Sequence, residues 1–147
     1  MVLQRKSKLH EMEEQFLRAF IMPKYYDRAY HELCSEDVNK RGNFFGKLER
    51  DHILKKNCKI DIPHLTKEQQ FPTIQSMLIS HGAKQDRAYI SSDTDSGTEQ
   101  NICFLDDGLK ECLSGIFLTV VLICDNVAFV QLERETGSPP RFLLAKR

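Results

Sequence analysis

The chain has 147 residues, 41% of them hydrophobic and 29% charged, and its 21 basic and 21 acidic residues give a formal net charge of zero. This length suits one domain, and this composition excludes an intrinsically disordered chain. The longest apolar run, 116–124, is too short for a membrane-spanning helix, and the opening MVLQRKSKLHEMEE lacks the apolar stretch of a secretory leader. We therefore expect a single cytoplasmic domain, residues 1–147.

Helical spacing dominates the first half of the chain, about residues 1–82. Apolar residues recur at intervals of three and four between Leu9 and Ile21, and Pro23 stops or kinks that helix. The same spacing predicts a second helix that ends at Cys34 and a third one, capped by Ser35, that continues to Leu48.

Residues 51–70 show the least regular pattern and are interpreted as a surface loop with one short extended piece, CKIDIP. Pro72 suits the first turn of the next helix, because its missing N–H is not needed there. Gly82 then supplies a left-handed stop, so this helix is predicted to lie between Pro72 and Gly82.

Strand patterns replace helical ones in the second half, about residues 86–147. RAYISS (87–92) is β-prone, a short strand is possible at 101–104, and LDDGLKECL reads as a short helix. FLTVVLIC (117–124) is apolar on both alternating sets, which is typical of a central strand buried on both faces. VAFVQLER forms a hairpin with it, and RFLLAKR adds a last strand.

These elements predict an α+β fold. The helical N-terminal half packs as one layer on a mostly antiparallel sheet that ends in a three-stranded β-meander.

Charge is unevenly distributed along the chain. Residues 40–59 contain seven basic and two acidic side chains, whereas residues 86–111 contain seven acidic and two basic ones. A folded molecule with two oppositely charged regions is the expected result.

The acidic stretch SSDTDSGTE (91–99) suggests a metal-binding loop at first sight. An EF-hand loop counted from Asp93 would need a glycine at position 6 and a glutamate at position 12, but Gly97 falls at position 5 and Phe104 at position 12. An exposed turn is the plainest interpretation. A weak cation site through Asp93, Asp95 and Glu99 and an acidic partner-binding loop stay open as alternatives.

Other metal and cofactor motifs are absent from the sequence. No HExxH pattern occurs, and Cys58 with His64 supplies only two of the four ligands that a structural zinc needs. The five cysteines include no CxxC pair, which favours reduced thiols. Of these, Cys34 and Cys58 have polar neighbours and are the plausible reactive thiols, whereas Cys103, Cys112 and Cys124 have apolar ones. We expect no metal and no cofactor.

Signatures of nucleophilic catalysis and of phosphate-binding loops are also absent, since there is no GxSxG, GxxxxGK[ST] or GxGxxG. The adjacent carboxylates of Asp106 and Asp107 are equally explained by the start of a helix. An enzyme with a dispersed acid–base site is the third hypothesis.

The basic run offers a nucleic-acid surface as the second hypothesis. Cationic side chains neutralise phosphates, and Phe44 and Phe45 among them could stack on bases. The alternative is a solvated helix face with the phenylalanines in the core. The candidate nucleic-acid-binding residues are Lys40, Arg41, Lys47, Arg50, Lys55 and Lys56.

From Arg87 onward, RAYISS, DTDSG, LDDGLKECL and VVLICDNVAFVQLE follow one another in an order and spacing that resemble small uncharacterised bacterial α+β proteins of the toxin-immunity type. The resemblance implies a non-enzymatic cytoplasmic protein that presents an acidic surface to a basic partner, such as a toxin. This binding module is the leading hypothesis. Its candidate partner-binding residues are Asp93, Asp95, Glu99, Asp106, Asp107 and Glu111.

Overall fold

The computed structural model describes residues 9–35, 37–49, 52–92, 101–117, 119–133 and 140–146. These residues form five α-helices, a short 3-10 helix η1 (Pro23–Tyr25) and six strands. The α-helices are α1 (Glu11–Phe20), α2 (Tyr26–Cys34), α3 (Val38–Glu49), α4 (Lys67–Ser80) and α5 (Leu105–Leu113). The strands are β1 (Lys59–Asp61), β2 (Ala88–Ser92), β3 (Ile102–Cys103), β4 (Val120–Cys124), β5 (Val127–Gln131) and β6 (Arg141–Ala145).

All six strands join one sheet in the order β1-β6-β5-β4-β2-β3, and every registered pair is antiparallel. The α+β fold and the C-terminal meander β4-β5-β6 are therefore confirmed. Every residue of β4 and β5 is buried, which also confirms a central place for the apolar strand. Asp125, in the two-residue turn between them, has a φ of 62°.

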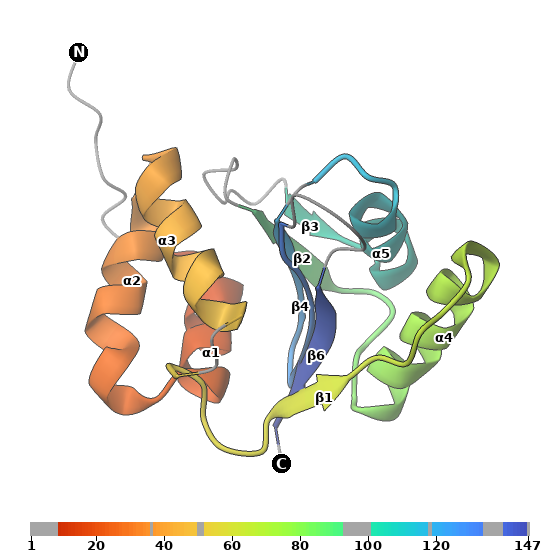
Figure 1. Ribbon diagram of the computed structural model, residues 1–147, viewed down its shortest axis with the longest axis horizontal. Helices are drawn as coiled ribbons and strands as arrows, with labels where there is room; N and C mark the ends of the chain where they lie inside the picture. Colours follow the sequence, from red (N-terminus) through yellow and green to blue (C-terminus); the bar gives the residue numbers. More distant parts are fainter. Residues whose placement is uncertain are drawn as a thin grey trace.

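Helices cover both faces of the sheet, α1 to α3 on one side and α4 with α5 on the other (Figure 1). Alternate strand residues divide between the two layers: Val121 and Ile123 belong to the core under α1–α3, and Val120 and Leu122 to the core under α4 and α5. The prediction of a single helical layer was wrong. A strand that is apolar on both alternating sets needs a cover on each face, and the sheet has one.

Two boundaries in the middle of the chain differ from the prediction. Helix α4 begins at Lys67 rather than at Pro72, because Gln69 Oε1 accepts a hydrogen bond from the backbone N–H of Thr66 (3.0 Å) and satisfies a donor at the start of the helix. Residues 51–70 are also not simply a loop. Leu54 forms a bridge with Ile21, and β1 pairs with β6.

The three N-terminal helices are confirmed close to their predicted bounds. Helix α1 buries Met12, Phe16, Leu17 and Phe20 along one stripe, and Pro23 begins the 3-10 turn that separates α1 from α2. Among the described residues, no helix combines the length and apolar character that a membrane crossing requires.

Candidate functional site

Helix α5 packs closely against the sheet next to its edge strand β3. A Cβ added at Gly108 would lie 2.8 Å from Cys103 Sγ and 2.8 Å from Leu122 Cδ1, so a larger residue at this position would force these side chains to move. Leu105, Leu109 and Cys112 are buried on the same side of the helix. The opposite side of α5 is left facing solvent.

That outer side presents one aromatic and two acidic residues. Phe104 precedes the helix, and Asp107 and Glu111 follow at i+3 and i+7, a spacing that places all three on one helical face. All three are exposed, and Phe104 has 61% of its surface accessible. We call Phe104, Asp107 and Glu111 the α5 surface.

The two carboxylates of the α5 surface act on the Cys103 thiol. The pKa of Cys103 is raised from 9.0 to about 11, first by burial and then by the negative charges of Glu111 and Asp107. Within the described parts of the chain, no ion pair includes Asp107 or Glu111.

Asp106 differs from its neighbour Asp107. It is half-buried, and its Oδ1 accepts a hydrogen bond of 2.7 Å from Gln75 Nε2. It thereby ties α5 to α4 rather than standing free on the outer face. The other predicted acidic residues, Asp93, Asp95 and Glu99, lie outside the described residues.

The basic segment 40–59 does not form one exposed patch. Arg41 is 1% exposed, and Phe44 and Phe45 are 0% and 1% exposed, so none of the three can contact a nucleic acid from the surface. This part of the second hypothesis was wrong, because Phe44 and Phe45 belong to the core under α1–α3 and Arg41 is buried against the carbonyl oxygens of Leu33 and Ser92. Lys47 Nζ pairs with Glu32 Oε1 at 2.7 Å.

The other basic candidates are scattered. Lys55 Nζ donates to the Arg18 carbonyl at 2.6 Å, at the end of α1. Lys40 and Lys56 are exposed on α3 and in the 52–58 segment, and Arg50 lies outside the described residues.

A buried polar network lies under α1 and α3. Glu13 is fully buried, and its two carboxylate oxygens accept hydrogen bonds from Tyr89 (3.3 Å) and Ser91 (2.8 Å) on β2. Arg41 Nη2 lies 3.8 Å from Glu13 Oε2, and the Arg41 guanidinium donates hydrogen bonds to the carbonyl oxygens of Ser92 and Leu33. The network fixes α1 and α3 to the end of β2, just before the acidic stretch.

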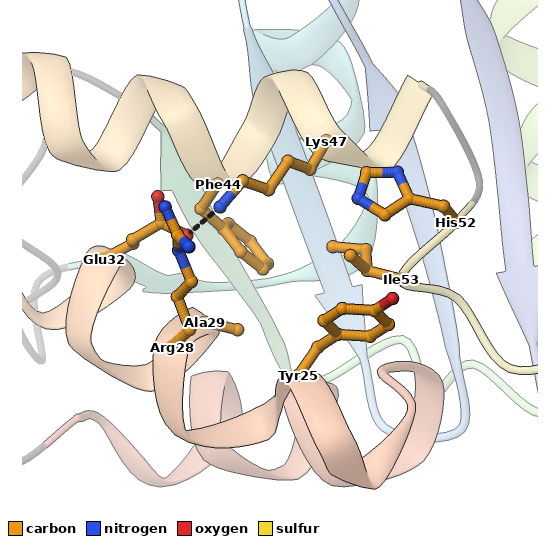
Figure 2. A pocket seen from close by; sticks show the side chains of 8 residues that line it. All are labelled: Tyr25, Arg28, Ala29, Glu32, Phe44, Lys47, His52 and Ile53. Carbon is orange, nitrogen blue, oxygen red and sulfur yellow. Dashed lines mark hydrogen bonds and ion pairs between the residues drawn. The ribbon is translucent and has the colours of Figure 1, made fainter.

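A pocket of about 150 Å³ opens between α2, α3 and the segment that follows α3. Figure 2 shows the Glu32–Lys47 ion pair on one side of it and Tyr25 opposite His52 on the other. The rings of Tyr25 and His52 are arranged edge to face, and their centroids are 5.8 Å apart. A cavity of roughly this volume accepts a group as large as benzene, so the pocket fits one small apolar side chain or ring.

The thiols give a mixed result. Cys34 and Cys58, the two candidates for a reactive thiol, are 0% and 5% exposed, which favours the alternative that they are ordinary buried cysteines. Cys112 and Cys124 are buried as expected, and burial raises the pKa of Cys112 to about 12 and that of Cys124 further. Cys103 is only half-buried.

The described residues include no cluster of three or more histidine, cysteine or acidic side chains that could hold a metal ion. Comparison of the chain with protein-family models, with curated proteins and with solved structures found no match.

Proposed function

We propose that this chain is a non-enzymatic binding module whose α5 surface docks a basic protein partner. The observation that supports it most is Phe104, a large aromatic side chain with 61% of its surface exposed, beside two exposed carboxylates on one helical face. Aromatic anchors surrounded by charged residues are typical of protein interfaces, where a few such side chains supply most of the affinity.

Two features next to the α5 surface, the exposed Ile116 and the short edge strand β3, support the same proposal. Ile116, 72% exposed, follows α5 and adds a second apolar contact. Strand β3 is the last strand of the sheet and is only two residues long, so a partner would meet side chains here rather than an extended backbone edge. Opposite charge on the partner would speed association, and the immunity-type resemblance suggests a basic toxin as its class.

The experiment uses the full chain as bait, with chemical cross-linking and mass spectrometry of the captured proteins from its native host. The wild-type chain is compared with Phe104→Ala and with the double reversal Asp107→Lys/Glu111→Lys. Matched controls are Ile79→Ala, a second exposed apolar residue on α4, and Asp61→Lys/Glu68→Lys, two exposed acids away from α5.

Losing an aromatic anchor worth about 2 kcal/mol lowers affinity more than tenfold. We expect that loss for Phe104→Ala and for the α5 reversal, with the controls unchanged and with cross-links on Lys110 or Ser114. A captured protein whose recovery is equally sensitive to the control variants, or insensitive to all of them, would contradict the proposal.

A further inference from the structure

A basic groove of about 470 Å³ lies away from α5, where five segments of the chain meet. Four cationic residues line it: Arg18 from α1, Lys55, Lys84, and Lys146 after β6. Asp125 is the one carboxylate among its described lining residues. We call this the basic groove.

Pairing of β5 with β6 brings three of the lining residues together, Asp125, Asn126 and Lys146. Val127 pairs with Ala145, so the β4–β5 turn lies next to the end of β6. The backbone N–H of Lys146 donates to the Asn126 carbonyl at 3.1 Å and fixes the two segments together. The carboxylate of Asp125 and the side chain of Lys146 thus start from neighbouring, well-anchored backbone.

The ends of α1 and α4 position the remaining cations of the groove. The backbone N–H of Lys55 donates to the Phe20 carbonyl at 2.8 Å, and its Nζ donates to the Arg18 carbonyl, which holds Lys55 beside the last turn of α1. Gly82, with a φ of 103°, ends α4 and turns the chain toward Lys84. Residues far apart in the sequence therefore share one concave surface.

The charges in the basic groove are only partly balanced. Lys84 Nζ lies 3.8 Å from Asp125 Oδ2, and its side chain is 71% exposed, which makes this a weak pair. Arg18 pairs with Glu14 across one helical turn at 2.9 Å, again with its own side chain largely exposed. An anion with several charges can compete for these cations.

We propose that the basic groove binds a small molecule that carries at least two phosphate groups. Its volume is within the usual range for small-ligand sites, and cations contributed by four separate segments of the chain suit a ligand with more than one negative group. None of its described lining residues is aromatic, so it offers no ring on which a nucleic-acid base could stack. A phosphorylated small molecule therefore fits better than a single-stranded nucleic acid.

Isothermal titration with inorganic tripolyphosphate, at about 0.15 M salt to screen distant charges, tests this proposal. The variant is Lys84→Glu/Lys146→Glu. Its matched control is Lys40→Glu/Lys67→Glu, which changes the net charge equally at two exposed lysines on α3 and α4. We expect single-site binding that the groove variant weakens roughly tenfold or more and the control less than about twofold.

A third variant, Asp125→Asn, removes the one opposing charge. Asparagine tolerates the left-handed backbone at this position, so the turn is preserved, and tripolyphosphate affinity should rise roughly two- to fivefold. Equal weakening by the groove and control variants, no rise with Asp125→Asn, or no binding of tripolyphosphate by the wild-type chain would overturn the proposal. So would binding of a thymidine oligonucleotide alone.

Discussion

Gly108 of α5 lies so close to Cys103 of β3 that a side chain at position 108 would displace the cysteine sulfur. A Cβ at position 108 would stand 2.8 Å from Cys103 Sγ and equally close to Leu122. This contact sets the height of α5 above the sheet, and with it the position of the α5 surface.

Gly108→Ala should destabilise the fold by about 1–2 kcal/mol, because overpacking outweighs the helical preference of alanine. Urea unfolding monitored by circular dichroism measures the change. In the same background, Cys103→Ala removes one of the two clashing atoms and should restore part of the loss. Gly46→Ala is the control: nothing lies within 4 Å of its added Cβ, so it should stabilise α3 by about 0.5–1 kcal/mol.

The Cys103 thiol should react slowly with an aromatic disulfide reagent at pH 8 in the native protein. A pKa of about 11 leaves only about one thiolate in a thousand at that pH. Replacing the carboxylates, Asp107→Asn/Glu111→Gln, lowers the pKa of Cys103 and should speed its modification severalfold, as followed by peptide mass spectrometry. Asp61→Asn, far from α5 in the fold, should leave the rate unchanged; an unaltered rate in the double variant would place the carboxylates elsewhere.

The same raised pKa has a consequence for stability. An unfolded chain releases the Cys103 proton at its ordinary pKa near 9.0, before the folded chain does at about 11. The free energy of unfolding should therefore decrease as the pH rises from 9 to 11, and it should not change through this group below pH 9. Equilibrium unfolding across this range, in wild type and in Cys103→Ala, isolates the contribution as the difference in slope.

Removing one member of the buried network should be costly. Arg41→Ala leaves the buried Glu13 carboxylate without its cation and should destabilise the fold by about 3–5 kcal/mol. Replacing both charges, Glu13→Gln/Arg41→Met, should recover much of that loss, and denaturant unfolding of the single and double variants gives the coupling energy. Strictly additive effects would show that the two side chains act independently.

Asn57 adopts a φ of 63°, a conformation that residues with a Cβ usually avoid. Asn57→Ala should destabilise the fold by about 1 kcal/mol, whereas Asn57→Gly should change stability by only a few tenths. Thermal unfolding of both variants distinguishes the backbone effect from loss of the side chain. A similar loss with glycine would assign the effect to the asparagine side chain instead.

Local patterns predicted the elements whose signals are local. The hairpin from Val120 to Gln131 follows from alternation and a two-residue turn, and α5 follows from its apolar stripe and acidic start. The start of α4 was missed although its signal was present: Thr66 and Gln69 have capping-box spacing, but Pro72 was taken as the first turn. The extended piece that contains β1 was predicted, but its place in the sheet was not, because its partner β6 lies some eighty residues away.

The candidate binding surfaces were harder to predict than the helices and strands, because the fold decides which side chains are exposed and which lie together. Lys40 and Arg41 are neighbours in a basic run, yet successive helical residues point about 100° apart, so one is exposed and the other buried. Lys84 and Lys146 lie far apart in the sequence, and only the sheet register and the end of α4 bring them to one groove. Phe104 could have been noted as an aromatic residue just outside a helical stripe.

The placement of α1–α3 over the C-terminal meander affects how the chain acquires its structure during synthesis. The apolar stripes with Phe16 and Phe20 are translated first, but their cover on β5 and β6 follows roughly a hundred residues later. At about 5–20 residues per second, that interval lasts on the order of ten seconds. The apolar side chains of α1–α3 are therefore synthesised well before the strands that cover them, and in that interval they are exposed to aggregation.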